Sequence, residues 1–483
     1  MFFNSYAYIL AFLPIAALIY SLSKMVSIKL SKIVMVIISI YFYCYITAEF
    51  LPVLAYSCVV TYGAYLAMSG YGHRKLIATL AIFVNALSLC YFKYIYFIVE
   101  FANIKDAEWM YSLGLPLAVS FFTFQQISFI ADYYKGKIRC VSFLDYLYYI
   151  AFFPKLIAGP ITRYNDLMLQ DGISRQPCSQ EILSGLMIFS VGLFKKVVLS
   201  GHFAVIADHG YLSVGSLTQL DAWITTLSYT MQIYFDFSGY SDMAIGTALL
   251  LGIRLPVNFK SPYKSLNIRD FWERWHISLS TWLRDYVYIP LGGSRVVNSR
   301  IYLNVIITFL VSGAWHGSGV NFLLWGLLHG VATCINRSWS LHGVRMPSFM
   351  AWIVTFFFIN ISWVPFRAKS FEDTTLVIKS MFGMAAGNES SIYLNSFSFE
   401  TFDIVVKAYS LPLTNIMWCL ITLGLSLALI FFKNSNEIAG YMKEDTGSVI
   451  KYRYVMISGF LLAAAIICMF GGVSASQFIY AAF

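Results

Sequence analysis

Long apolar runs separated by short loops are the feature that most constrains the fold of this chain. A helix that crosses a membrane needs roughly 20 predominantly apolar residues, whereas a membrane barrel shows alternating segments of about ten residues. The runs here are continuous, so they predict helices. They lie near residues 5–23, 31–48, 50–69, 76–100 and 113–134 in the first third, and near 301–316, 318–336, 348–366, 411–433 and 454–472 in the last third.

The composition excludes an ordinary soluble domain. Of the 483 residues, 59% are hydrophobic and 12% are charged, whereas a soluble globular domain carries about 25% charged residues. We therefore predict an all-α, polytopic integral membrane protein with about 11–13 membrane segments, some of them re-entrant or interfacial. We expect one membrane-embedded domain over residues 1–483, with N-terminal helices at 1–112, a core at 113–336 and C-terminal helices at 337–483.

The charges of the first loops alternate along the chain. The loops after the first, third and fifth runs are basic, and those after the second and fourth are acidic. Because cytoplasmic loops carry an excess of lysine and arginine, this pattern predicts an N-terminus outside the cytoplasm. The net charge of +9 is explained by basic loops at a lipid surface, so we expect membrane lipid as a partner and no nucleic acid.

Motifs for bound metals, nucleotides or a serine nucleophile are missing from the sequence. The eight cysteines are scattered without a CxxC pair, so we expect no metal site. There is no Walker loop, no GxGxxG and no GxSxG elbow. We expect no tightly bound cofactor.

The middle third differs from the plain apolar runs. Residues 142–180 are interrupted by Pro154, Gly159, Pro160 and Pro177. Irregular backbone at membrane depth survives only where protein or a water-filled cavity surrounds it, so we predict a re-entrant or interfacial segment.

Two further segments depart from plain membrane helices. Asp236 and Asp242 lie inside the apolar run 221–252, and carboxylates there are costly unless they face a polar interior. Between residues 367 and 410 the chain is more polar, with Glu389 among its acidic residues. We predict an extramembrane loop with a short helix there.

The stretch from 271 to 330 concentrates ionisable and aromatic side chains, including three of the seven histidines. Placed on one helix, residues 272–286 have an aromatic face and a charged face, with His276 at the border. This pattern predicts an amphipathic helix at the membrane interface or at the mouth of a cavity. An aromatic belt that anchors the fold explains the same pattern.

His316 follows an almost wholly apolar run, and glycines at 313, 317 and 319 surround it. An ionisable residue at membrane depth is a candidate functional residue, and a histidine can act as general base in acyl transfer to an alcohol. The competing interpretation is a neutral imidazole bonded to a backbone carbonyl. For His329 we favour a structural role.

Several blocks together resemble the membrane-bound O-acyltransferase (MBOAT) family, in the branch of the alginate O-acetylases. The most specific are RWHISLS, which contains His276, and WHG, which contains His316. The block WVPFRA at 363–368 matches more weakly. The other matching blocks lie at 115–137, 152–163, 232–246, 258–293 and 315–330.

This resemblance implies a catalytic role for His316, a second essential histidine at His276, and a central tunnel lined by both. It implies that acetyl-CoA donates the acyl group from the cytoplasm. It further implies a bacterial inner-membrane location and a periplasmic SGNH-type partner, or the polysaccharide itself, as acceptor. As further residues lining the tunnel or the substrate we predict Trp315, Trp275, Asp236, Arg284 and Asp285.

One position departs from the family pattern. Glu273 stands where relatives often carry a basic residue, and a carboxylate there cannot hold the donor's phosphates. The candidates for that task are Arg254, Lys260, Arg269 and Arg274.

Three functions follow from these features. The first is an O-acetyltransferase that moves acetyl from acetyl-CoA across the membrane onto an exported polysaccharide, of alginate type or another cell-surface glycan. The second is a transporter or flippase subunit of an export complex without its own acyl transfer. The third is a structural subunit whose activity resides in a partner. The resemblance favours the first.

Overall fold

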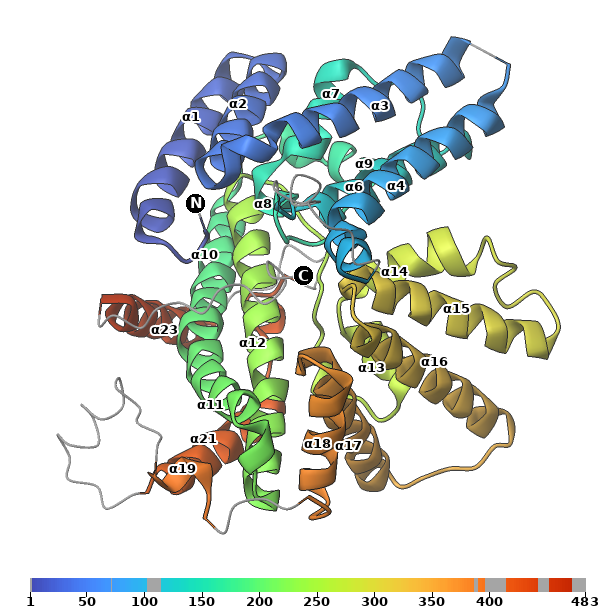
Figure 1. Cartoon of the computed structure of the whole chain (residues 1–483). Helices are drawn as coiled ribbons and strands as arrows, with labels where there is room; N and C mark the ends of the chain where they lie inside the picture. Colours follow the sequence, from blue (N-terminus) through green and yellow to red (C-terminus); the bar gives the residue numbers. More distant parts are fainter. Residues whose placement is uncertain are drawn as a thin grey trace. The chain divides into compact units, whose positions relative to one another are not determined.

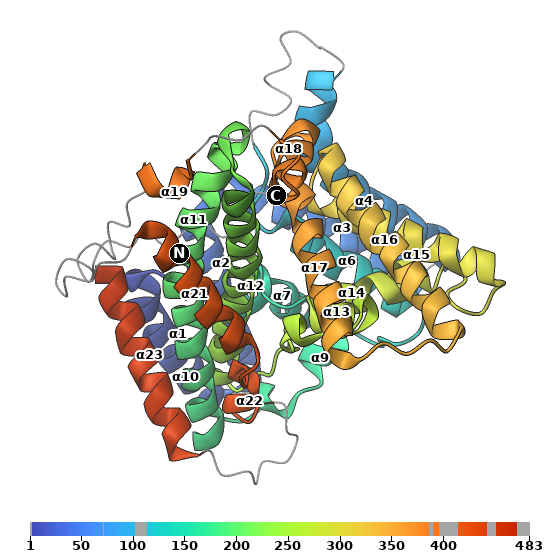
Figure 2. The ribbon, with the colours of Figure 1, turned by 90° about the horizontal axis from the view of Figure 1, so that it is seen from below.

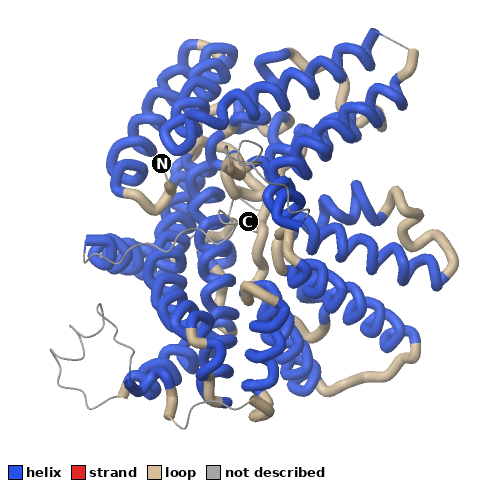
Figure 3. Tube along the Cα trace, viewed as in Figure 1, coloured by secondary structure: helices blue, strands red, loops and turns tan. Residues whose placement is uncertain are grey.

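The computed structural model describes an all-helical protein. Its described residues are 2–70, 72–101, 114–385, 390–395, 414–441 and 451–470, and within these ranges the backbone forms helices and connecting loops without a strand (Figures 1 and 3). Six helical stretches are long and apolar enough to cross a membrane, and the all-α, multi-pass prediction is confirmed. These stretches are Ala7–Val26, Ile28–Gly70, Arg74–Ile95, Ser179–Leu212, Ser348–Arg367 and Tyr452–Phe470.

The chain divides into two compact units. Unit 1 comprises 1–189 and 240–257, and unit 2 comprises 190–239 and 258–483. The assignment of the whole chain to one membrane domain stays a prediction. Unit 1 contains η1 (Ala7–Phe12), α1 (Leu13–Val26), α2 (Ile28–Thr47), η2 (Ala48–Phe50), α3 (Leu51–Gly70), α4 (Arg74–Phe101), α6 (Val119–Tyr134), α7 (Phe143–Ala151), α8 (Phe153–Leu156), α9 (Tyr164–Met168) and η3 (Asp171–Ile173).

Unit 2 holds the later helices and the site described below. Helix α10 (Ser179–Phe194) and helix α12 (Gln219–Leu250) contribute residues to both units. The remaining elements are η4 (Lys195–Ser200), α11 (Gly201–Leu212), η5 (Val214–Ser216), η6 (Pro262–Lys264), α13 (Ile268–Arg274), α14 (Ile277–Leu283), η7 (Arg284–Tyr288), α15 (Asn298–His316), α16 (Val320–Leu341), α17 (Ser348–Arg367), α18 (Phe371–Met381), α19 (Ile392–Asn395), α21 (Asn415–Ile430), α22 (Ser435–Ile438) and α23 (Tyr452–Phe470).

The predicted interruption at 142–180 is present in unit 1 as a series of short helices. Helix α7 ends at Ala151, and α8 is four residues long with Pro154 in its first turn. A Cβ at Gly159 would lie 2.5 Å from the Cα of Lys155, so glycine is required where the chain turns back on α8. The side chains of this turn are buried, as irregular backbone at membrane depth requires.

The polar segment after residue 367 contains the predicted short helix. Helix α18 begins after Ser370, whose side chain accepts a hydrogen bond from the backbone N–H of Asp373 and so caps the helix. Glu389 lies outside the described residues.

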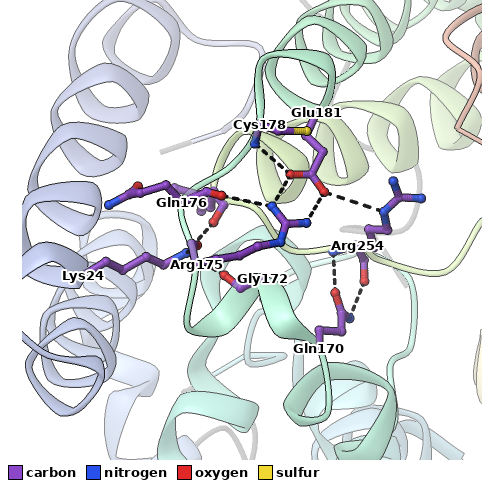
Figure 4. Close-up of polar contacts among 9 residues, drawn as sticks. Lys24, Gln170, Gly172, Arg175, Gln176, Cys178, Glu181 and Arg254 are labelled. Atoms are coloured by element: carbon purple, nitrogen blue, oxygen red, sulfur yellow. Dashed lines mark hydrogen bonds and ion pairs between the residues drawn. The ribbon is translucent and has the colours of Figure 1, made fainter. Parts of the chain in front are cut away.

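A buried lysine ties together three segments of unit 1 (Figure 4). The Lys24 amine, in the last turn of α1, donates hydrogen bonds to the backbone carbonyls of Gly172, Arg175 and Leu251, at 2.7, 3.0 and 3.0 Å. Beside it, the carboxylate of Glu181 accepts hydrogen bonds from both terminal nitrogens of the Arg175 guanidinium, at 2.8 and 2.7 Å. We call these residues, with Gln170 and Arg254, the Lys24 cluster.

Gln170 extends the Lys24 cluster to the chain after α12. Its amide accepts from the backbone N–H of Arg254 at 2.8 Å and donates to the carbonyl of the same residue at 2.8 Å. The side chain thus pairs with backbone as a neighbouring strand would. The Arg254 guanidinium lies 4.0 Å from Glu181.

In unit 2, helices α15 and α16 form a closely packed hairpin, visible side by side in Figures 1 and 2. A Cβ at Gly313 would lie 2.3 Å from the carbonyl oxygen of Phe322, and a Cβ at Gly326 would lie 2.4 Å from that of Phe309. Only glycine lets the two backbones approach this closely. The hairpin fixes the position of His316 at the end of α15 relative to α16.

Candidate active site

His316 is the last residue of α15 and is buried, with 3% of its surface exposed. Its ring contacts those of Trp325 and Phe366, with centroids 4.9 and 5.1 Å away. The backbone carbonyls at a helix C-terminus carry partial negative charge, which favours a cationic side chain there. The fold therefore places this imidazole at the negative end of the α15 dipole and shields it from water.

The prediction of one continuous helix over 272–286 is wrong, because the helix breaks at His276. Helix α13 ends at Arg274, α14 begins at Ile277, and His276 between them has a left-handed backbone with φ of +42°. The cause lies outside the local sequence. The backbone carbonyl of Asn258 accepts a hydrogen bond from the backbone N–H of Ile277 at 3.1 Å. The side-chain oxygen of Asn258 accepts a second one from the backbone N–H of Ser278 at 3.2 Å. These bonds replace the helical ones and turn the His276 side chain inward.

The His276 ring is fully buried beside aromatic rings. Its centroid lies 4.6 Å from that of Phe237 and 6.3 Å from that of Trp315. His276 lies outside the candidate membrane spans, and burial lowers its pKa to about 3, so the ring is neutral near pH 7. The Trp315 ring also lies 4.7 Å from that of His316. The two predicted histidines thus contact the same tryptophan.

His329 belongs to the same set of rings, which sequence reasoning did not predict. It is fully buried, accepts a hydrogen bond from the indole nitrogen of Trp272 at 3.3 Å, and lies 4.9 Å from the ring of Trp325. Trp363 of α17 stacks on Trp325 at 6.0 Å. We define the aromatic cluster by these contacts as Trp272, Trp275, His276, Trp315, His316, Trp325, His329, Trp363 and Phe366.

Sequence reasoning gave too little weight to Trp325 and Trp363. The signals were present, because Trp325 lies between His316 and His329 in the chain and Trp363 opens the block WVPFRA. Trp275, predicted as a lining residue, does belong to the cluster, and its ring lies 5.0 Å from that of Trp363.

Asp236 forms a buried ion pair that the sequence did not predict. Its partner is Lys196, and Ser200 donates to the same carboxylate oxygen at 3.2 Å. Both partner residues lie on η4, a π-helical turn between α10 and α11. Such turns occur frequently at functional sites. The pair explains how this carboxylate stays buried in an apolar helix.

Arg284 and Asp285 lie on η7 and pair with each other at 2.7 Å. The arginine side chain is 60% exposed, so this pair is more open to its surroundings than the aromatic cluster. A role for the pair in lining the substrate stays a prediction.

Three of the four candidates for holding donor phosphates lie beside carboxylates, and the fourth, Lys260, is exposed. Arg254 belongs to the Lys24 cluster, Arg269 pairs with Glu273, and Arg274 pairs with Asp270 at 2.6 Å. Within the described ranges, no group of three or more histidine, cysteine or acidic side chains is arranged to hold a metal ion.

Comparison with known proteins decides the family. Residues 134–367 match the sequence profile of MBOAT, the membrane-bound O-acyltransferase family. The chain is 41% identical over 440 residues to a peptidoglycan O-acetyltransferase of Helicobacter pylori, covering 82% of this chain and 83% of the relative. The chain belongs to the MBOAT family.

Other MBOAT relatives bear different names. A probable alginate O-acetylase, AlgI, of Pseudomonas aeruginosa is 36% identical over 408 residues, covering 81% of this chain and 77% of the relative. A teichoic acid D-alanyltransferase of Bacillus subtilis is 29% identical over 277 residues, covering 53% of this chain and 69% of the relative. The matched region of the MBOAT profile contains Asp236, His276, His316 and Trp363. This protein is a membrane-bound acyltransferase.

Proposed function

We propose that this chain transfers acetyl from acetyl-CoA to a hydroxyl group of an exported cell-surface glycan. Two of its relatives are named for O-acetylation, one of peptidoglycan and one of alginate. The acceptor proposed here is an exported glycan of alginate type or another surface polymer. The observation that carries the proposal is His316, a buried imidazole at a helix C-terminus enclosed by aromatic rings.

In the proposed reaction, His316 acts as general base. The imidazole takes the proton of the acceptor hydroxyl while its oxygen attacks the thioester carbonyl carbon. The C–O bond forms and the carbonyl electron pair moves onto oxygen. When the intermediate collapses, the C–S bond breaks and the thiolate takes the proton from His316. Enclosure by aromatic rings excludes water, which would otherwise hydrolyse the thioester.

His276 has a different proposed role. Because burial keeps its ring neutral, it acts as a hydrogen-bonding group and not as a cation. Its ring lies beside Trp315, which also contacts His316, so we assign it to positioning the acceptor or the donor in the proposed tunnel. A periplasmic SGNH-type protein that passes acetyl to the polymer, and a bacterial inner-membrane location, complete the proposal.

The test compares surface glycans from cells that express the wild-type chain or His316→Ala. We expect O-acetyl groups on the glycan to fall at least 100-fold, as loss of a general base predicts, while expression and membrane insertion persist. His342→Ala is the matched control, because His342 is exposed and directly follows the last residue of α16. Full acetylation by the His316→Ala chain contradicts the proposal. Glycan export that is retained by a variant lacking both His276 and His316, while acetylation is lost, separates the acetyltransferase from the transporter.

A further inference from the structure

Three buried N–H groups of the aromatic cluster have no hydrogen-bond acceptor among the residues that the structure describes. They are Nε2 of His329 and the indole nitrogens of Trp325 and Trp363. These side chains are at most 1% exposed. Their rings lie close together, with centroid distances of 4.9, 6.0 and 6.3 Å. We call these three groups the donor triad.

All three groups of the donor triad can only donate hydrogen bonds. An indole nitrogen can only donate a hydrogen bond. The indole of Trp272 donates to Nδ1 of His329 at 3.3 Å, so Nδ1 carries no proton. The proton of the neutral ring therefore lies on Nε2. All three members of the triad are donors, and their complement is an acceptor oxygen.

Buried donors without acceptors are costly and uncommon in folded proteins. Weak contacts between N–H groups and aromatic faces recover only part of that cost. The presence of three such groups on neighbouring rings is therefore better explained by a functional role than by chance. Their position links this role to His316, because the ring of Trp325 contacts the rings of both His329 and His316, with centroid distances of 4.9 Å in each case.

We propose that the donor triad binds the carbonyl oxygen of the acyl thioester and stabilises the oxyanion formed when the acceptor hydroxyl attacks. This rests on the proposed function, since it assigns a second task at the site of His316. The proton of the hydroxyl goes to His316, the C–O bond forms, and the carbonyl electron pair settles on the oxygen held by the triad. Collapse of the intermediate returns that pair to the carbonyl and breaks the C–S bond.

The composition of the triad favours a single carbonyl oxygen over a phosphate. The triad itself has three neutral donors and no lysine or arginine. A phosphate carries more charge and is recognised in proteins by cationic side chains or helix N-termini. A carbonyl oxygen becomes negative only as the reaction proceeds, and fixed dipoles directed at that developing charge are the common device for acyl transfer.

The test removes single N–H groups and keeps an aromatic ring at each position. Trp325→Phe and Trp363→Phe are compared with wild type in membrane vesicles that contain the full chain, with acetyl-CoA and a glycan acceptor. We expect kcat to fall about 10²- to 10³-fold, as for other oxyanion donors, with KM for acetyl-CoA within about threefold. The inflection of the kcat–pH profile should not move, because His316 remains. Trp339→Phe is the matched control, since this indole on the same helix as Trp325 donates to the carbonyl of Val344 at 2.8 Å.

Thermal stability separates a catalytic donor from a structural one. A donor without an acceptor adds no stabilising hydrogen bond to the fold. Any fall in the melting temperature of the two phenylalanine variants therefore reflects only the volume lost when indole becomes phenyl, and it should not follow the fall in kcat. A fall in melting temperature proportional to the loss of activity would show a packing role and overturn the proposal.

His329 offers a second, independent comparison. In His329→Asn the side-chain oxygen can replace Nδ1 as acceptor for Trp272, but nothing replaces the Nε2 donor. In His329→Gln the amide nitrogen reaches the position of Nε2. We expect kcat of the asparagine variant to fall about 10²-fold and that of the glutamine variant to fall at least tenfold less. Equal activity of the two overturns the assignment.

The result for His316→Ala in the same assay separates this inference from the proposed function. If His316→Ala is inactive but all three triad variants keep wild-type kcat, the donor triad is wrong and the proposed function stands. If His316→Ala keeps wild-type activity, the proposed function itself fails.

Discussion

The Lys24 cluster of unit 1 and the donor triad of unit 2 both bury polar nitrogens in a largely apolar protein. At Lys24 the amine donates to three backbone carbonyls, at 2.7 to 3.0 Å, and two of the residues that supply them, Gly172 and Arg175, are labelled in Figure 4. At the donor triad, none of the three N–H groups meets an acceptor within the described part of the chain. Both groups are buried, but their hydrogen bonding differs.

This difference separates structure from function better than burial or charge alone. An ionisable group inside a membrane protein is usually taken as a functional site, and Lys24 would qualify on that ground. Its complete set of hydrogen bonds indicates instead that it joins α1 to the loop before α10 and to the end of α12. The donor triad carries no formal charge, yet its incomplete bonding points to a ligand.

The largest effect is expected when the Lys24 cluster is broken. Lys24→Met leaves three carbonyls without their donor, and an unsatisfied buried polar group costs about 1–3 kcal/mol. We expect the variant to lose about 3–5 kcal/mol of stability, measured by thermal unfolding in detergent. Activity per folded molecule should persist.

Lys29→Met is the control for this variant, because Lys29 is exposed near the start of α2. Its melting temperature should match wild type. If Lys24→Met also melts like wild type, the lysine bonds contribute no net stability and the contrast between the two regions fails.

A smaller loss of folding stability is expected when the pH is lowered, because of His276 in the aromatic cluster. The folded-state pKa of His276 is lowered to about 3 by burial, below the value near 6.5 of an exposed histidine. The unfolded ring therefore binds a proton as the pH falls through about 6.5, and the folded ring does not. Stability is fully present above pH 6.5 and should fall by about 1.4 kcal/mol per pH unit below it, or about 2 kcal/mol at pH 5.

His276→Gln isolates this contribution from those of other titrating groups. The difference in unfolding free energy between wild type and the variant is measured at pH 7.5 and at pH 5. We expect wild type to lose about 2 kcal/mol more than the variant over this interval. Parallel pH dependence in the two proteins would mean that the His276 ring binds its proton over the same pH range in the folded and unfolded states.

The smallest effect is expected at the exposed pair of Arg269 and Glu273 on α13. The side chains lie 3.0 Å apart but are 78% and 61% exposed. An exposed pair with this spacing contributes about 0.3–0.5 kcal/mol. Glu273→Gln should therefore change stability by less than about 0.5 kcal/mol and leave kcat unchanged, measured beside the two larger effects. A change in KM for acetyl-CoA would instead place this carboxylate next to the donor.

Local patterns in the sequence predicted the helices well. The apolar runs near 5–23, 50–69 and 348–366 correspond to helices at Ala7–Val26, Leu51–Gly70 and Ser348–Arg367. The reason is that membrane helices satisfy their own backbone hydrogen bonds, so length and hydropathy suffice.

Contacts between distant residues were not predictable in this way. The break at His276 depends on Asn258, which lies outside any helical window around it. The ion pair of Asp236 depends on Lys196, 40 residues earlier. Likewise, the structural assignment of His329 considered only its neighbours in sequence, and its contact with Trp272 comes from 57 residues away.

The glycine contacts between α15 and α16 have a consequence for protein engineering. Because Gly313 and Gly326 allow no side chain at the crossing, the hairpin that carries His316, Trp325 and His329 cannot widen to admit a larger substrate. An engineer who wants a bulkier acyl group or a new acceptor should leave this hairpin intact and diversify α14 and those positions of α13 and α17 that lie outside the aromatic cluster. Libraries directed at those helices would vary substrate choice while the proton-transfer chemistry is inherited unchanged.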